Sequence, residues 1–178
     1  SSMRFTQTPL AGAYVVDLEK RGDDRGYFAR AFCAREFAEQ GLATVFVQAN
    51  MSLNRDTGTL RGLHFQRAPA QETKLVRCVT GALYDVIVDI RPDSPTYLQS
   101  FGAELTAENG RALYVPKGFA HGFLTLVPDT TASYMVDEYY TPEAEGGLRH
   151  DDPALGIDWP GEVHVISPKD AAWPLLET

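Results

Sequence analysis

The stretch RGLHFQRAPAQETK, residues 61–74, decides how the rest of this sequence is interpreted. In an extended strand, alternate side chains point to opposite faces. One face is then predicted to carry Arg61 and Leu63, and the other Gly62, His64 and Gln66. A His and a Gln that share a face with a Gly need a polar interior or a ligand, because buried polar groups must be paired. The stretch alone fits both a structural and a functional histidine.

Strands separated by turns extend from this stretch in both directions. Short apolar or alternating runs recur about every ten residues, with Gly, Pro, Asn and Asp between them. The predicted strands are residues 13–18, 44–50, 59–66, 75–80, 83–91, 98–105, 111–115, 122–126 and 132–138. This spacing predicts an all-β fold, a sandwich or barrel closed by Greek-key connections.

Helical signals are few. Residues 34–41 are predicted to form a helix that stops at Gly41. Residues 167–170, Ser-Pro-Lys-Asp, are predicted as the N-cap and first turn of a short terminal helix. The 178 residues are expected to form a single domain, with a loop-rich tail over residues 141–178 packed on the barrel. Ser1 and Ser2 resemble a tag remnant.

The composition is that of an ordinary soluble globular protein, with 44% hydrophobic and 22% charged residues. The formal net charge of −8 argues against nucleic acid or an anionic membrane as a main partner. Two cysteines, Cys33 and Cys78, are too few for a disulfide framework and predict a reducing, cytoplasmic location. No run approaches the about 20 apolar residues that a membrane helix needs.

The segment from Pro116 to His121, PKGFAH, resembles the second motif of the cupin jelly roll, and Gly81 fits the end of the first motif. Metal-binding cupins take two His and a carboxylate from the first motif and a third His from the second. Here the first motif offers His64 followed by Phe and Gln, with no second His and no Glu in the usual place. Because two neutral imidazoles without a carboxylate bind Fe or Zn poorly, no metal is predicted.

Without a metal, His64 is available as a general base. A catalytic imidazole needs an acceptor, normally a carboxylate, on its other nitrogen. The candidates are Asp85, Asp89 and Asp170, and their spacing does not choose among them.

Abstraction of a proton next to a carbonyl also needs a group that holds the enolate oxygen and an acid that returns a proton. Lys74, which begins the strand after His64, fits the first role. Tyr134, within the apolar run of residues 132–136, fits the second. A strand-edge lysine and a packing tyrosine remain the alternatives for these two residues.

Phosphate binding would depend on side chains, because the sequence has neither a P-loop nor a GxGxxG motif. Arg25, Arg61 and Arg111 could each bind a phosphate through two nitrogens. A solvated surface arginine is the alternative, above all for Arg111.

Together these motifs resemble the dTDP-4-dehydrorhamnose 3,5-epimerase family. The likeness runs with matching spacing from about Val15 to Leu175. The matching segments are RGLHFQ (61–66), KLVR (74–77), DV (85–86), DIR (89–91), SPT (94–96), AEN (107–109), PKGFAHGF (116–123), YY (139–140), DDP (151–153) and GIDWP (156–160). Several motifs in one order are far more specific than any one of them.

The resemblance implies a cupin-type jelly-roll homodimer with exchanged N-terminal strands and no cofactor or metal. The implied substrate is dTDP-4-dehydro-6-deoxy-D-glucose, a 4-keto sugar nucleotide. Its C4 ketone acidifies the hydrogens at C3 and C5. A base on one face and an acid on the other can therefore invert both centres, which gives dTDP-4-dehydro-L-rhamnose in deoxysugar biosynthesis.

By motif match, the resemblance makes His64 the base, Asp170 its orienting partner, Tyr134 the acid and Lys74 a sugar contact that stabilises the enolate. It assigns to sugar or nucleotide binding the residues Arg25, Gln48, Asn50, Arg61, Lys74, His121, Glu145 and Lys169. Two positions on the nucleotide side depart from the family pattern: Arg30 stands where the family has Glu, and Ala49 where it has Asp.

The leading hypothesis is therefore an isomerase that epimerises a sugar nucleotide at C3 and C5. The nearest alternative inverts only C3 or only C5 of a related 4-keto sugar nucleotide, because one base and one acid suffice for a single centre. More distant hypotheses are a 3,4-ketoisomerase, a metal-dependent cupin dioxygenase and a non-catalytic sugar-binding cupin.

Overall fold

A computed structural model describes residues 3–177 of the chain; the two serines expected to be a tag remnant, and Thr178, lie outside the described residues. The helical segments are α1 (Ala34–Glu39), the 3-10 helix η1 (Pro142–Ala144) and α2 (Pro168–Ala171). The strands are β1 (Met3–Gln7), β2 (Tyr14–Leu18), β3 (Arg21–Asp23), β4 (Gly26–Phe28), β5 (Gln48–Asn54), β6 (Thr59–Gln66), β7 (Lys74–Thr80), β8 (Ala82–Asp89), β9 (Ser100–Thr106), β10 (Ala112–Val115), β11 (Phe119–Thr125), β12 (Thr130–Val136), β13 (Glu145–Gly147) and β14 (Val165–Ile166).

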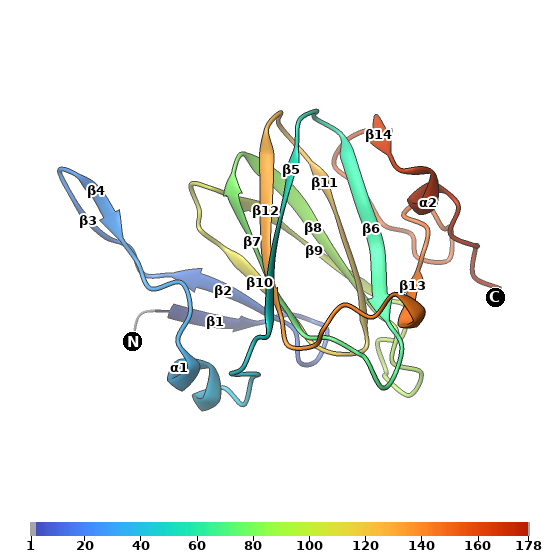
Figure 1. Ribbon diagram of the computed structural model, residues 1–178, viewed down its shortest axis with the longest axis horizontal. Helices are drawn as coiled ribbons and strands as arrows, with labels where there is room; N and C mark the ends of the chain where they lie inside the picture. The colour runs from blue at the N-terminus through green and yellow to red at the C-terminus, as the bar shows by residue number, and fades with distance from the viewer. Residues whose placement is uncertain (1–2, 178) are drawn as a thin grey trace.

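Two sheets face each other and form the barrel-like body of the molecule (Figure 1). The first has the order β1-β2-β10-β7-β12-β5, and the second the order β13-β6-β11-β8-β9. Neighbours within these orders are antiparallel, and β14 adds to β6 in parallel. Strands that are distant in sequence lie side by side, as Greek-key connections require. The predicted all-β, cupin-like jelly roll is confirmed.

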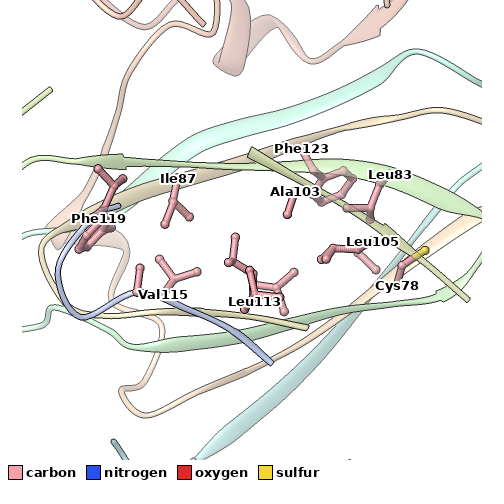
Figure 2. Packing of buried hydrophobic residues seen from close by; sticks show 14 residues of the cluster. Cys78, Leu83, Ile87, Ala103, Leu105, Leu113, Val115, Phe119 and Phe123 are labelled. Atoms are coloured by element: carbon pink, nitrogen blue, oxygen red, sulfur yellow. The ribbon is translucent and has the colours of Figure 1, made fainter. Parts of the chain in front are cut away.

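The core lies between the two sheets (Figure 2). Alternate residues of each strand point inward, as Leu83 and Ile87 do on β8 and Val76 and Cys78 do on β7. These side chains are almost completely buried. The apolar filling occupies one part of the interior, and a different part is left polar.

Most predicted strands are confirmed, and the differences have local causes. The predicted strand over residues 44–50 was wrong at its start, since β5 begins at Gln48 and runs to Asn54. The residues before it pack over the outside of the first sheet, where Leu42 and Phe46 contact the cluster around Phe37. Sequence patterns also missed β1, β3, β4, β13 and β14, which are all five residues long or shorter.

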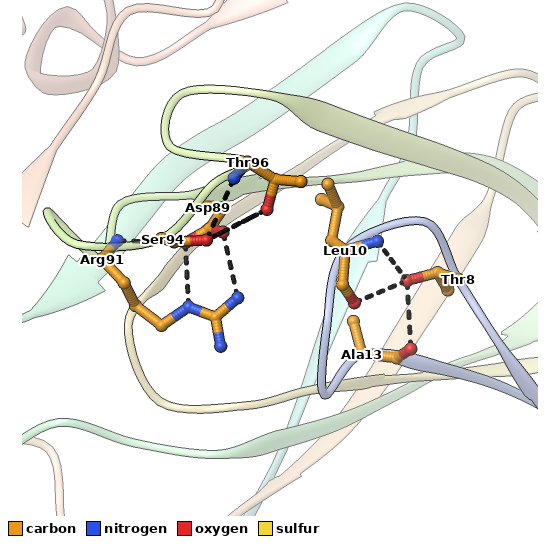
Figure 3. Close-up of polar contacts among 7 residues, drawn as sticks. All are labelled: Thr8, Leu10, Ala13, Asp89, Arg91, Ser94 and Thr96. Carbon is orange, nitrogen blue, oxygen red and sulfur yellow. Dashed lines mark hydrogen bonds and ion pairs between the residues drawn. The ribbon is translucent and has the colours of Figure 1, made fainter.

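Two groups of polar contacts lie in the β1–β2 turn and around the end of β8 (Figure 3). Thr8 Oγ1 donates to the carbonyl oxygens of the turn. Asp89 is fully buried and accepts hydrogen bonds from Arg91, Ser94 and Thr96. Burial raises the pKa of Asp89, but these hydrogen bonds outweigh burial and hold the pKa well below its ordinary value. Asp89 is thus committed to these hydrogen bonds and is not the partner of His64.

The tail after β13 packs on the outer face of the second sheet. Leu148 and Leu155 form an apolar cluster there with Leu63, Val88 and Ala120. The tail ends in the parallel β14–β6 pairing and in α2, which lies against β6. Because the tail packs on this sheet, α2 lies next to β6, the strand that contains His64.

Candidate active site

A bulge in β6 brings Arg61 and His64 into one cavity. His64 is opposite His121 on β11, but Arg61 is opposite Phe123, so β6 contains one extra residue between the two pairs. The predicted alternation, with Arg61 facing away from His64, is therefore wrong. Gly62 makes the bulge possible: its φ is +121°, and a Cβ there would lie 2.6 Å from the Gly122 Cα.

The cavity lies between the sheets and has two adjoining parts. Its outer part has a volume of about 450 Å³. A smaller part of about 140 Å³ is named the inner part because the buried His121 lines it. His64, Lys74 and Tyr134 line both parts. Of the residues predicted for the site, the outer part adds Gln48, Asn50 and Glu145, and the inner part adds Arg61 and His121. Residues from six strands, β5, β6, β7, β11, β12 and β13, thus converge on one polar cavity.

His64 is held by Asp170 from α2. Its Nε2 lies 2.6 Å from Asp170 Oδ1, and the same carboxylate accepts from the Gly62 N–H at 3.1 Å and from Trp173 Nε1 at 3.0 Å. Burial raises the pKa of Asp170, but the hydrogen bonds from His64, Gly62 and Trp173 outweigh burial and leave the pKa below its ordinary value. Asp170 is an ionised acceptor that leaves His64 Nδ1 available to the cavity.

Trp173 reaches this carboxylate because Gly147 on β13 has no side chain. A Cβ at Gly147 would lie 2.1 Å from the Trp173 ring. The Trp173 ring also stands edge-on to His64, with 6.2 Å between the ring centroids. The tail therefore fixes both the carboxylate and the imidazole plane.

Lys74 lies on the cavity wall beside Tyr134. Its ammonium is 5.8 Å from the centre of the Tyr134 ring and 3.4 Å from Glu72 Oε1. Burial, and then the negative charge of Glu72, raise the pKa of the Tyr134 phenol. The phenol therefore stays protonated at neutral pH, the form that can donate a proton.

A second His–carboxylate pair lies at the inner end of the cavity. His121 Nε2 lies 2.6 Å from Asp85 Oδ1, and both residues are buried. Burial is the largest of the effects that set the pKa of His121 below its ordinary value. Asp85 is thus paired with His121, and among the three candidate aspartates only Asp170 reaches His64.

The remaining predicted residues divide between the cavity rim and the surface. Lys169 forms an ion pair with Glu145 at the rim, and Gln48 Oε1 accepts from the Tyr140 N–H at 2.9 Å. Arg25 does not join the site of its own chain, because it sits on the projecting β3–β4 hairpin, 89% exposed and paired with Asp23 (Figure 1).

The side chains of three further residues that the sequence singled out do not line the cavity of this chain. Arg111, a candidate phosphate ligand, is bonded to Asp17 at 2.8 Å on the first sheet and does not line the cavity. Ala49, where the family pattern has Asp, is exposed on β5, while its neighbours Gln48 and Asn50 line the cavity. Arg30 is also exposed. Neither departure from the pattern therefore alters the carbon chemistry around His64.

The sequence profile described as dTDP-4-dehydrorhamnose 3,5-epimerase matches residues 7–178. The chain belongs to the dTDP-4-dehydrorhamnose 3,5-epimerase family. The enzyme of that name from Sinorhizobium fredii is 47% identical over 175 residues, which cover 98% of this chain and 90% of the relative.

Solved epimerase structures share the fold over nearly the whole chain. The Bacillus anthracis dTDP-4-dehydrorhamnose 3,5-epimerase, crystallised with TDP and PPi bound, is 45% identical, with a TM-score of 0.95 over 98% of this chain and 100% of that chain. The Legionella pneumophila dTDP-6-deoxy-D-glucose-3,5-epimerase, in complex with dTDP-4-keto-L-rhamnose, is 42% identical, with a TM-score of 0.92 over 97% of this chain and 92% of that chain.

Sequence reasoning missed two residues of this candidate site, Glu72 and Trp173. Glu72 lies in the segment before β7, where no pattern marks it as buried. Its spacing of two residues from Lys74 was the available signal, since alternate residues share a face. Trp173 has no local signal, because only the packed tail brings it to Asp170.

Among residues 3–177, no group of three or more His, Cys, Asp or Glu side chains is arranged to hold a metal ion. Within the same residues, no helix is long and apolar enough to cross a membrane.

Proposed function

We propose that this protein converts dTDP-4-dehydro-6-deoxy-D-glucose to dTDP-4-dehydro-L-rhamnose by inverting C3 and C5, a step of deoxysugar biosynthesis. The observation that carries the proposal is the single cavity that His64, Lys74 and Tyr134 line together, with Asp170 bonded behind His64. Membership of the epimerase family supports the same substrate class.

In this mechanism, His64 removes the hydrogen next to the C4 ketone. The Asp170 carboxylate holds the imidazole and stabilises the imidazolium that forms. The Lys74 ammonium stabilises the enolate oxygen, because it already lies in the cavity with little water around it. Tyr134 then donates a proton to the opposite face of the carbon, which inverts the centre.

The reaction balances without a redox partner or a cofactor. One proton leaves carbon and one proton returns to it, so the substrate and product have the same atoms and oxidation state. We therefore propose that no cofactor takes part.

We assign binding of the sugar and the nucleotide to the polar rim formed by Gln48, Asn50, Glu145 and Lys169, and to Arg61 and His121 in the inner part of the cavity.

The experiment is the conversion of dTDP-4-dehydro-6-deoxy-D-glucose in deuterated buffer, followed by proton NMR. Inversion at both centres replaces the hydrogens at C3 and C5, so the L-rhamno product should carry two solvent deuterons. One deuteron at a single inverted carbon would instead establish the single-centre epimerase. Absence of any exchange would refute epimerisation of this substrate.

We also infer a homodimer in which the N-terminal strands contact the partner. The β3–β4 hairpin projects from the barrel (Figure 1). It exposes Tyr27 and Phe28, and β5 exposes Met51 and Leu53. Large apolar side chains left this exposed are candidates for burial against a partner. Arg25, isolated from its own cavity, would then bind nucleotide phosphates in the partner.

The dimer is tested by light scattering after gel filtration. Phe28→Asp together with Met51→Asp should give a monomer that has lost nucleotide affinity, whereas a dimer with these changes would contradict the interface.

We also propose a cytoplasmic location. Cys33 and Cys78 are free thiols, which supports it.

A further inference from the structure

The buried pair formed by His121 and Asp85 has no assigned chemical role. Asp85 projects from β8 into the interior, and the Asp85–His121 contact joins β8 to β11. The Asp85 side chain is completely buried. Its Oδ1 is bonded to His121 Nε2, but its Oδ2 has no hydrogen-bond partner among the described residues.

Such a carboxylate is expensive to bury. A charged oxygen without a partner has lost its hydration and gained nothing in return. Its nearest neighbours on this face of β8, Leu83 and Ile87, are ordinary apolar core residues. An apolar residue at position 85 would extend that core, so folding alone does not account for Asp85.

His121 supplies the functional connection. It is directly opposite His64 on the neighbouring strand and lines the inner part of the same cavity. Asp85 occupies Nε2, which leaves Nδ1 as the nitrogen for a ligand. Because burial keeps the imidazole neutral, one nitrogen carries hydrogen and the other accepts.

The inner cavity has few side-chain acceptors. Arg61 and Lys74 can only donate hydrogen bonds, and His64 is occupied by the reacting hydrogen. Apart from His121, the side chains of this lining that can accept are the hydroxyls of Ser52 and Tyr134, and Tyr134 is the proposed acid. A sugar ring brings hydroxyl groups that must donate once they leave water, and a site that pairs them discriminates strongly against analogues that lack them. His121 Nδ1 is the uncharged nitrogen acceptor on this wall.

We propose that Asp85 is a positioning residue that fixes His121 as the Nε2–H tautomer, so that His121 Nδ1 accepts a hydrogen bond from a sugar hydroxyl beside the reacting carbons. This inference rests on the proposed function, because the hydroxyl belongs to the proposed substrate. Asp85 does not touch the substrate; it acts through the imidazole.

The first test reads the tautomer directly by NMR of the full-length protein with ¹⁵N-labelled histidine. His121 in the wild type should show a protonated Nε2 and an unprotonated Nδ1 at neutral pH. A protonated Nδ1, in either the other tautomer or an imidazolium, would overturn the proposal. This measurement needs neither turnover nor a variant, so it stands even if the protein does not epimerise the proposed substrate.

The second test is a double-mutant cycle. Asp85→Asn should lower kcat/KM about 100-fold, because an amide can turn its NH₂ toward Nε2 and reverse the tautomer. In a His121→Gln background, Asp85→Asn should change kcat/KM no further. An equal loss in both backgrounds would mean that Asp85 acts independently of His121, which would also overturn the proposal.

Asp89→Asn is the matched control, since Asp89 is a fully buried carboxylate at the end of the same strand. It should lower thermal stability, yet leave the His121 tautomer and kcat/KM of the folded enzyme unchanged. If Asp89→Asn also changed the His121 tautomer, the tautomer would depend on core packing in general and not on Asp85, which would overturn the proposal.

Discussion

Asp170→Asn tests the proposed catalytic pair while almost preserving its shape. The Asp170 carboxylate accepts three hydrogen bonds: Oδ1 takes those of His64 and Trp173, and Oδ2 takes that of the Gly62 N–H. An amide offers one oxygen and one NH₂. In either orientation, the NH₂ therefore faces at least one N–H that the carboxylate had satisfied.

The two orientations have different consequences for the rate. If the amide oxygen faces His64, the tautomer survives and the loss is that of charge-assisted hydrogen bonding, about 1.5–3 kcal/mol, or roughly 10- to 150-fold. If the NH₂ faces His64, Nδ1 becomes protonated and the base is lost, which in a His–Asp pair costs about 10⁴-fold. We expect a decrease between about 10- and 10⁴-fold in proton abstraction, depending on which orientation the amide takes.

The assay is the initial rate of deuterium incorporation at C3 and C5, measured by proton NMR at saturating substrate. Nucleotide affinity, measured by calorimetry, should be retained because Asp170 lies behind His64. Asp152→Asn is the control, since Asp152 is a buried carboxylate of the same tail that bonds only backbone N–H groups. Exchange by Asp170→Asn at the wild-type rate would refute the pairing.

The pH dependence of stability gives an independent check on Asp170. Its pKa in the folded protein lies below its ordinary value, so folding favours the ionised form. The stabilisation is present above the unfolded pKa of about 3.9 and disappears as the pH falls through the folded pKa. The stability difference between the wild type and Asp170→Asn should therefore be largest near neutral pH and shrink in acid, as followed by urea unfolding.

Three further changes probe other parts of the molecule. Tyr134→Phe should slow completed inversion more than deuterium exchange, because only the returning proton is lost; equal losses would show that Tyr134 is not the acid. Glu72→Gln removes a charge that raises the Tyr134 pKa, so the basic limb of the kcat profile should move to lower pH. Asp89→Asn should lower the free energy of unfolding by about 3 kcal/mol at neutral pH, and by less in acid because the folded pKa of Asp89 is depressed; an unchanged urea midpoint would contradict this.

Strands were predictable from sequence because their side chains alternate, whereas the bulge that builds the site was not. A bulge adds one residue without changing the local composition, so strict alternation placed Arg61 away from His64. The glycine at position 62 was visible, but its positive φ depends on the close approach of Gly122 on a strand about sixty residues later. The local sequence therefore predicts that a strand forms, whereas its register depends on contacts with residues distant in the sequence.

The three candidate aspartates show the same limit for the site. Spacing could not choose among them, because the fold alone closes the 106-residue separation between His64 and Asp170. The resemblance to the epimerase family selected Asp170, and the geometry agrees. Asp85 and Asp89, which lie on one face of β8, take different partners, His121 and Arg91.

Two His–Asp pairs have the same 2.6 Å contact, and their histidines lie on the adjoining strands β6 and β11. The difference in burial between the two imidazoles separates their proposed roles. The His64 side chain is 32% exposed, and the His121 side chain is 7% exposed. A base that exchanges substrate hydrogen for solvent deuterium must pass its proton to water, which only the exposed imidazole can do. Burial instead lowers the pKa of His121 and keeps it a neutral acceptor. One chemical pair can therefore serve as the base at the open side of the cavity and as a fixed hydrogen-bond acceptor at its inner end.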